Sequence, residues 1–322
     1  MTELTGAQIL LKALKEQGVD TIFGYPGGAV LPIYDELFQQ NHIRHFLARQ
    51  EGGAAHAAEG YARATGKVGV LLVTSGPGAT NAITGLTDAL MDSIPLVCIS
   101  GQVPTSLIGS DAFQECDTTG ITRPCTKHNY LVRKTADLSR IIHQAFYVAR
   151  SGRPGPVLVD IPKDVQFASA AYKSFKDEPH PTYQPQRQPD KKLVREAAKL
   201  LWQAKKPIIY AGGGLINSGG QCHPLLQQLV HMGHFPITLT LMALGAFPAS
   251  DDHFLGMLGM HGTFEANHAM HQCDVMLCLG ARFDDRITGR LDAFSPHSKK
   301  IHVDIDPSSI NKTVEVDVPI IG

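Results

Sequence analysis

One acid, Glu51, begins a run of small residues, Glu51-Gly-Gly-Ala-Ala-His-Ala-Ala-Glu-Gly60, directly after an apolar stretch that is typical of a β-strand. Small neighbours let a flat ligand or another backbone segment approach the carboxylate closely. Burying an ionised group without a partner costs several kcal/mol, so a buried Glu51 implies a hydrogen-bonding partner. An acid in the first turn of a helix is also stabilised by the helix dipole, and sequence position leaves both interpretations open.

Glycine-rich turns form a second group of candidate sites, and they follow predicted strands at residues 24–28, 76–78, 101, 212–214 and 280. In open parallel sheets, ligands bind outside the carboxyl ends of the strands, so these turns predict two ligand crevices. Glycine is also what any tight turn requires, and each turn alone has a purely structural interpretation. The segment 212–220 does not match the GxGxxG fingerprint in register, although a nucleotide could meet the N-terminus of the helix that follows.

Other side chains with possible chemistry give weaker signals. Gly280-Ala-Arg-Phe-Asp-Asp-Arg286 could hold a pyrophosphate or a ribose, or its charges could pair with one another. His268, His271 and Cys273 do not predict a metal site, because the cysteine points away from the helix face that the two histidines share and no fourth ligand is near. Ser75 lies in Thr-Ser-Gly-Pro-Gly and not in a GxSxG elbow, so a serine hydrolase is not predicted.

The elements that must position these residues alternate between short apolar strands and helices. Strands are predicted at residues 21–23, 43–47, 68–74, 96–100 and 157–161, and again at 208–211, 237–240, 275–279 and 300–305. Helices are predicted between them at 6–17, 31–39, 52–65, 79–91, 138–149, 191–204, 223–232 and 263–271. This alternation predicts an α/β fold with two doubly wound parallel-sheet domains.

Two irregular segments interrupt the alternation. The passage from residue 101 to 127 is long for a loop inside a compact domain, and loops of that length are usually functional. Residues 167–188 are rich in Pro, His, Gln and Lys, which is typical of an extended linker and puts a domain boundary near residue 180.

Bulk composition excludes several classes of protein. The 322 residues suit two domains of about 150 residues each. Lys and Arg number 29 against 30 for Asp and Glu, and no dense basic stripe occurs, so no nucleic-acid binding is predicted. Without a recognisable secretory signal, membrane span or CxxC pair among the six cysteines, we expect a cytoplasmic protein with reduced thiols and no membrane partner.

Seven motifs occur in order along the chain: Phe23–Ala29, Thr74–Asn81, Asp111–Glu115, Ser151–Val157, Asp160–Asp164, Leu258–Gly262 and Gly280–Arg286. Together they resemble the catalytic large subunit of acetohydroxyacid synthase, also called acetolactate synthase, within the thiamine-diphosphate enzymes. The likeness is closest to the bacterial forms and runs from about Leu4 to the last residue.

The resemblance implies a division into domains. Residues 1–165 are similar to the domain that binds the pyrimidine ring of thiamine diphosphate, 166–189 to a linker, and 190–322 to a central FAD-binding domain of Rossmann-like character with an incomplete C-terminus. The family's third domain holds Mg²⁺ and the diphosphate through a GDG motif and a later asparagine, and no such sequence occurs here. We therefore expect a truncated chain that contributes no metal ligand of its own.

The resemblance assigns roles around thiamine diphosphate residue by residue. Glu51 matches the glutamate that hydrogen-bonds the aminopyrimidine ring and so helps to deprotonate the reacting carbon of the cofactor. Gln114 and Lys163 match a polar and a cationic position near the entrance of the substrate channel that leads to the partner subunit's site. The turn that faces the reacting carbon is matched by Pro26, Gly27 and Gly28, and substrate-channel positions are matched by Pro104, Ala112 and Phe113.

The family also binds FAD, which is largely structural there because the reaction has no net redox step. The resemblance favours the ligand-binding interpretation of the glycine and arginine clusters. Positions that contact FAD are matched by Arg153, Gly212, Gly213, Gly214, Thr240, Leu241, Leu258, Gly259, Met260, His261, Gly280, Ala281, Arg282, Asp284, Arg286, Asp304 and Ile305.

The activity that the resemblance implies is decarboxylation of pyruvate on thiamine diphosphate and transfer of the hydroxyethyl unit to pyruvate or 2-ketobutyrate. The products, 2-acetolactate and 2-aceto-2-hydroxybutyrate, begin the biosynthesis of the branched-chain amino acids valine and isoleucine. The expected partners are a second large subunit, in a homodimer with active sites at its interface, and a regulatory small subunit. The missing diphosphate motif leaves an alternative, in which the chain is a noncatalytic fragment that binds FAD or another subunit.

Overall fold

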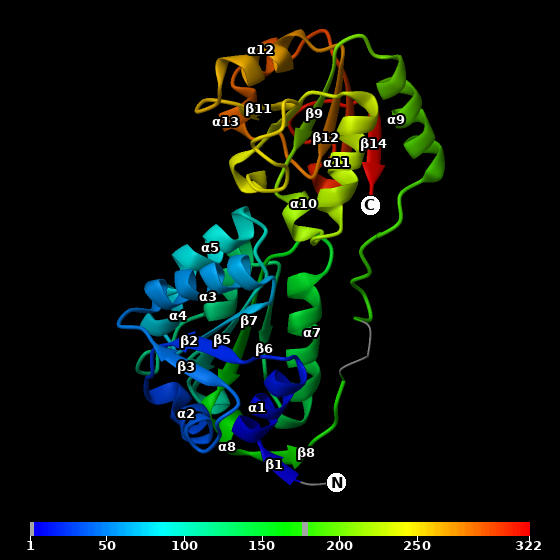
Figure 1. Cartoon of the computed structure of the whole chain (residues 1–322). Coiled ribbons are helices and arrows are strands. Elements are labelled where there is room, and N and C mark those ends of the chain that lie inside the picture. The colour runs from blue at the N-terminus through cyan, green and yellow to red at the C-terminus, as the bar shows by residue number, and fades with distance from the viewer. Residues whose placement is uncertain (1–2, 176–179) are drawn as a thin grey trace. The chain divides into compact units, whose positions relative to one another are not determined.

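The computed structural model describes residues 3–175 and 180–322. It divides into two compact units, residues 1–184 and 185–322, which Figure 1 shows with their elements labelled. The division falls inside the segment predicted as a linker. The start of that segment is structured, since it includes the end of helix α8 (Lys163–Phe167) and strand β8 (Ser169–Ala171).

The first unit is built on a six-stranded sheet in the order β3-β2-β4-β5-β7-β6, and every neighbouring pair is parallel. Its strands are β2 (Thr21–Gly24), β3 (Arg44–Leu47), β4 (Gly69–Val73), β5 (Leu96–Gln102), β6 (His128–Leu131) and β7 (Pro156–Pro162). Its helices are α1 (Gly6–Glu16), α2 (Leu31–Phe38), α3 (Glu51–Thr65), α4 (Pro77–Asn81), α5 (Ile83–Met91), α6 (Thr118–Thr122), α7 (Leu138–Arg150) and α8 (Lys163–Phe167).

Helices cover both faces of this sheet. Val70 and Leu72 of β4 pack in one buried cluster with residues of α1, α2 and α7, whereas Leu71 and Val73 pack in another with residues of α3 and α5. Successive side chains of a strand point to opposite faces, so a strand buried on both sides must be apolar throughout, as β4 is. The first doubly wound domain that the sequence predicts is confirmed.

The second unit repeats this plan, with parallel strands in the order β11-β10-β9-β12-β13-β14. One face packs against α9 and α11 and the other against α12, so this domain is also doubly wound. Its strands are β9 (Pro207–Ala211), β10 (Ile237–Leu239), β11 (Phe254–Met257), β12 (Val275–Leu279), β13 (Lys299–Asp304) and β14 (Val318–Ile321). Its helices are α9 (Lys191–Gln203), α10 (Gly214–Asn217), α11 (Cys222–Gly233), α12 (Phe264–Gln272) and α13 (Asp285–Thr288).

Several elements differ from those predicted. The edge strands β6, β11 and β14 were not expected, nor was the antiparallel ribbon in which β1 (Glu3–Thr5) pairs with β8. The helix predicted over residues 79–91 is two helices, α4 and α5, which meet at Ala82. Short 3₁₀ helices lie at residues 28–30, 105–107, 123–125, 135–137, 241–243, 291–293 and 307–309.

Membrane-spanning helices and the state of the cysteines can be checked in the structure. Across residues 3–175 and 180–322, none of the helices has both the length and the apolar composition needed to cross a lipid bilayer. All six cysteines are free thiols, and four of them are buried.

Candidate functional site

The first candidate site lies at the carboxyl edge of the sheet in the first unit, where β2 and β4 end in tight turns. A Cβ atom on Gly24 would lie 2.3 Å from the carbonyl oxygen of Leu72, and one on Gly27 would lie 2.5 Å from the Thr74 side chain. The Ala29 amide donates a hydrogen bond to Thr74 Oγ1 at 3.2 Å. The two turns therefore pack too closely to leave room for a side chain at these positions. Glycine permits this close approach because it has no Cβ atom.

Glu51 is the first residue of α3 and is buried, with 8% of its surface exposed. Asn81, at the end of α4, donates a hydrogen bond through Nδ2 to Glu51 Oε2 at 3.0 Å. The other oxygen, Oε1, lies beside Gly78, where a Cβ atom would be 3.7 Å away. Among the described residues no hydrogen bond to Oε1 occurs, so this oxygen is available to a ligand.

The predicted substrate residues come from loops at the same edge of the sheet. Gln114 adopts a left-handed conformation, with φ of 57°, and its carbonyl lies against Gly76, where a Cβ atom would be 2.4 Å from the oxygen. Phe113 beside it is 88% exposed. The Glu115 carboxylate accepts hydrogen bonds from the amides of Gly109 and Ala112, which closes the loop and lowers the pKa of Glu115.

Lys163 begins α8 directly after β7, and Pro104 precedes a turn directly after β5. Their segments are joined, since Thr105 donates a backbone hydrogen bond to the carboxylate of Asp164 at 3.0 Å. The structure thus brings Pro104 and Lys163 to one end of two neighbouring strands, and Ala112 to the loop that covers the turn after β4.

A buried carboxylic acid lies behind these loops. Asp160 on β7 is 1% exposed, and it accepts hydrogen bonds from Ser100 Oγ at 2.7 Å and from Gln102 Nε2 at 2.9 Å. Burial raises the pKa of Asp160 to about 7, although both hydrogen bonds oppose the rise. The sequence motif at Asp160–Asp164 did not suggest this acid, because its partners come from another strand.

The raised pKa of Asp160 makes stability depend on pH. The folded state binds a proton that the unfolded state has lost above pH 4, so the contribution is present at low pH and disappears as pH rises through about 7. We expect the unfolding free energy of the wild type, measured with urea between pH 5 and 8, to fall by a few kcal/mol relative to that of Asp160→Asn. A difference between the two proteins that stays constant over this pH range would contradict the assignment.

The second candidate site lies at the carboxyl edge of the sheet in the second unit, where the turns after β9 and β12 pack against each other. The Gly212 amide donates to the Leu279 carbonyl at 2.8 Å, and the Gly214 amide donates to the Gly280 carbonyl at 3.0 Å. A Cβ atom on Gly212 would lie 2.3 Å from the Gly280 carbonyl oxygen, and one on Gly214 would lie 2.7 Å from Gly280 Cα. Such a bare backbone surface suits close approach of a phosphate or a ring.

Polar groups surround this crevice. Thr240 follows β10, and its buried Oγ1 has no hydrogen-bond partner among the described residues, so it could bind a ligand. Asp284 caps α13 by accepting from the Arg286 amide at 3.0 Å, and it pairs with Arg282 at 2.8 Å, so both interpretations of this charged cluster remain compatible with the structure. These features fit a dinucleotide, whose phosphates need amide donors and cations.

The remaining residues predicted to contact FAD occupy several positions. Leu258 is buried, while Leu241, Met260 and His261 are exposed. Asp304 ends β13, and Ile305 follows it. Arg153 belongs to the first unit, where its guanidinium donates to Ser93 Oγ at 2.8 Å and to the carbonyls of residues 90 and 91. Its predicted contact with FAD stays a prediction.

A cavity of about 590 Å³ lies elsewhere in the second unit, near the amino ends of β9 and β10. Trp202, Lys205, Lys206 and His234 are among the residues that line it. None of the predicted site residues lines it, and we place no function there.

The two doubly wound sheets, each with bare turns at the carboxyl ends of its strands, define an α/β cofactor-binding protein. Residues 4–121 match the family model described as thiamine pyrophosphate enzyme, N-terminal TPP binding domain, and residues 194–322 match the one described as thiamine pyrophosphate enzyme, central domain. The chain therefore belongs to the thiamine pyrophosphate enzymes; thiamine pyrophosphate is another name for thiamine diphosphate.

Similar proteins narrow this classification. The chain is 54% identical over 322 residues to the acetolactate synthase large subunit IlvB1 of Mycobacterium tuberculosis, and 52% identical over 324 residues to the acetolactate synthase isozyme 3 large subunit of Escherichia coli. All of this chain is covered in both comparisons, against 52% and 56% of the relatives. The chain thus spans about half the length of the curated relatives that it matches. The resemblance to acetolactate synthase large subunits is confirmed.

Asn81 is the residue at this site to which the sequence assigned no role. It ends the motif Thr74–Asn81, so the signal was present, but a hydrogen bond between side chains 30 positions apart depends on how α3 and α4 pack. The structure makes Asn81 the residue that orients Glu51.

Proposed function

We propose that this chain carries the aminopyrimidine half of an acetolactate synthase active site. The observation that carries the proposal is the buried Glu51 carboxylate, with one oxygen held by Asn81 and the other available beside a glycine. A fixed, buried acceptor of this kind can hold one edge of a flat heterocycle through a charged hydrogen bond. The identity of about half of all residues to acetolactate synthase large subunits supports the same function.

Thiamine diphosphate would supply the carbanion chemistry of the reaction. The residues of this chain would orient it: Glu51 by the hydrogen bond to the ring, and Pro26, Gly27 and Gly28 by leaving the turn after β2 open. A Cβ atom on Gly28 would meet nothing within 4 Å, so this turn leaves space for a ligand. Mg²⁺ enters the proposal as the partner of the cofactor's diphosphate, and we assign no residue of this chain to it.

FAD is proposed to bind in the second unit, in the crevice bordered by Gly212, Gly214, Gly280 and Thr240. The missing Cβ atoms support this assignment, as does the Thr240 hydroxyl, which has no hydrogen-bond partner in the described part of the chain. The arginines of the segment 280–286 would then neutralise the pyrophosphate. The predicted FAD contacts at positions 258–261, 304 and 305 belong to the same proposal.

For substrates we propose pyruvate and 2-ketobutyrate, each a small 2-keto acid with one carboxylate. Lys163 supplies a positive charge and Gln114 a polar group at the edge where Glu51 lies. Phe113 and Ala112 would border the path to this edge, together with Pro104. The exposure of Phe113 supports this role, because a large apolar side chain in water is usually covered in the working assembly.

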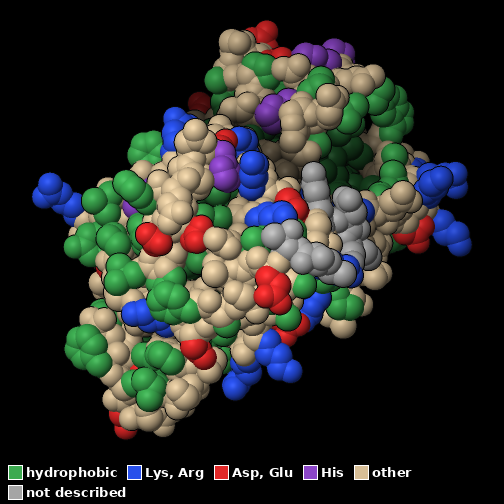
Figure 2. Space-filling model, turned by 90° about the horizontal axis from the view of Figure 1, so that it is seen from below, with side chains coloured by type: hydrophobic (Ala, Val, Ile, Leu, Met, Phe, Trp, Pro, Cys, Tyr) green, Lys and Arg blue, Asp and Glu red, His purple; other side chains and the backbone are tan. Residues whose placement is uncertain are grey.

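The proposed partners are a second copy of the chain and a regulatory small subunit. Leu31 and Phe38 of α2 are exposed hydrophobic residues, as are Phe46 and Leu47 of the edge strand β3. Figure 2 shows hydrophobic side chains gathered on the left, the side on which Figure 1 places α2 and β3. Apolar patches of this kind mark interaction surfaces, which supports a dimer. We propose the cytoplasm as the compartment in which it acts.

The proposed function is tested by assaying the protein that contains this sequence for acetolactate formation from pyruvate, with thiamine diphosphate, Mg²⁺ and FAD present. We expect acetolactate formation that depends on thiamine diphosphate. If the protein binds FAD and yields no acetolactate, the alternative of a noncatalytic FAD-binding chain is correct instead.

The hydrogen bond from Asn81 gives a second prediction. Removing the donor in Asn81→Ala should leave the Glu51 carboxylate free to rotate, and we expect kcat to fall about 10-fold with a smaller change in KM. Asn81→Gln, which retains the amide, should recover part of the loss. If kcat were unchanged in Asn81→Ala, Asn81 would not orient Glu51.

A further inference from the structure

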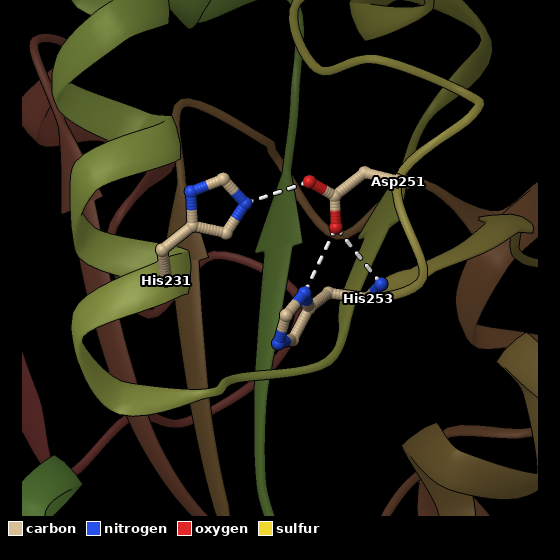
Figure 3. Close-up of side chains that lie close together, drawn as sticks. All are labelled: His231, Asp251 and His253. Carbon is tan, nitrogen blue, oxygen red and sulfur yellow. Dashed lines mark hydrogen bonds and ion pairs between the residues drawn. The ribbon is translucent and has the colours of Figure 1, made fainter.

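Two histidines and an aspartate of the second unit converge outside the sites described above. His231 comes from the last turn of α11, while Asp251 and His253 come from the loop before β11. Figure 3 shows the two imidazole rings directed at different oxygens of the Asp251 carboxylate. His231 Nε2 lies 2.6 Å from Asp251 Oδ2, and His253 Nδ1 lies 2.8 Å from Asp251 Oδ1.

These side chains are held in place by their surroundings. The His253 backbone amide donates to Asp251 Oδ1 at 3.0 Å, and the His253 carbonyl accepts from the Ile237 amide of β10 at 2.9 Å. The rings of His231 and His234 lie 5.5 Å and 5.8 Å from the ring of His253. Asp251 is 17% exposed at its side chain, whereas His231 is 54% exposed, which leaves a path for an ion to enter.

We infer that His231, Asp251 and His253 form a site for a divalent transition-metal ion of the Zn²⁺ type. The three ligand atoms lie within 4.8 Å of one another. In a tetrahedral site with metal–ligand distances of about 2.1 Å, ligand atoms are about 3.4 Å apart, so none of the three separations must change by more than about 1.4 Å. Both imidazole nitrogens must be unprotonated to bind the ion, so the ion competes with protons for them.

The donor set decides the class of metal. Two imidazoles and one carboxylate suit Zn²⁺, Co²⁺ or Ni²⁺, whereas Ca²⁺ and Mg²⁺ require sets rich in oxygen. Three protein ligands leave a fourth position for water. The ion would join the end of α11 to the loop before β11. Its binding would therefore stabilise the second unit against unfolding.

A second cluster, formed by His56, Glu59 and Asp88, is a weaker candidate. Glu59 is paired with Arg63 at 2.6 Å, so its charge is already neutralised by a neighbour on the same helix. His56 therefore serves as a matched control, because it is an exposed histidine beside a carboxylate. The inference does not depend on the proposed function, since neither cluster includes a residue assigned to a cofactor.

The test is calorimetric titration of Zn²⁺ into chelator-treated protein, paired with thermal unfolding. We expect one site with micromolar affinity or tighter and a rise in Tm on adding Zn²⁺. His231→Ala and His253→Ala should each weaken binding at least about 10-fold, while His56→Ala should leave it unchanged. His231 is exposed, so its replacement should not prevent folding. Failure of the wild type to bind Zn²⁺, or equal binding by His231→Ala, would overturn the proposal.

Discussion

Replacing Glu51 with glutamine is expected to lower the rate of acetolactate formation by at least about 100-fold, which is the lower range for the loss of a group that assists proton transfer. Asn81 donates to one of the two Glu51 oxygens, so an amide oxygen would take that position. The amide nitrogen would then face the cofactor, where it donates a hydrogen bond and can no longer stabilise a protonated ring. Turnover is measured from pyruvate at saturating thiamine diphosphate.

The control for this change is Glu59→Gln. Glu59 lies two turns further along α3 and is as buried as Glu51. Its carboxylate pairs with Arg63, so it does not serve the proposed cofactor site. We expect it to lower stability and to leave turnover within a few-fold of the wild type. If both variants lost activity equally, the loss would reflect damage to α3, and the role of Glu51 would be rejected.

Gly212→Ala is expected to destabilise the second unit and to abolish flavin binding. The added Cβ would lie 2.3 Å from the Gly280 carbonyl oxygen and 2.5 Å from Ala281 Cβ, and both belong to a turn that cannot move without breaking its contact with β9. Overpacking of this kind costs about 1–3 kcal/mol, and more where backbone must shift. Urea unfolding measures the loss of stability, and visible flavin absorbance per chain measures binding.

Gly220→Ala is the matched control, because a Cβ atom at this exposed position would meet nothing within 4 Å. We expect stability and flavin content like those of the wild type. Retention of full flavin content by Gly212→Ala would show that FAD does not use this crevice, whatever the change in stability.

Most of the strands that could be predicted from the sequence are buried on both faces, and the exposed edge strand β3 is an exception. β4 and β12 are uninterrupted apolar runs, and β5 begins with four apolar residues, as expected for strands of a parallel sheet covered by helices on both sides. The edge strands β6 and β11 are only partly buried; β6 carries His128 and Asn129, and the short strand β11 is interrupted by Gly256. Edge position is a property of the assembled sheet and has no local signal.

The contacts within the candidate sites also lack a local signal in the sequence. Glu51 could be singled out because a lone acid among small residues is unusual within one short segment. Its partner Asn81, the pair of Asp160 with Ser100, and the approach of His231 to Asp251 all join residues 20 to 60 positions apart. Such pairs exist only once the helices and strands have packed, so their residue types alone could not identify them.

The short ribbon of β1 and β8 has a consequence for the order of folding. Glu3 pairs with Ala171, and the Gly6 amide at the start of α1 donates to the Ala168 carbonyl at 2.9 Å. Residues made early in the synthesis of this unit therefore find their partners among residues made near its end. In a nascent chain that ends before residue 171, β1 and the start of α1 still lack their partners in and before β8. This unit therefore completes its packing late in its own synthesis.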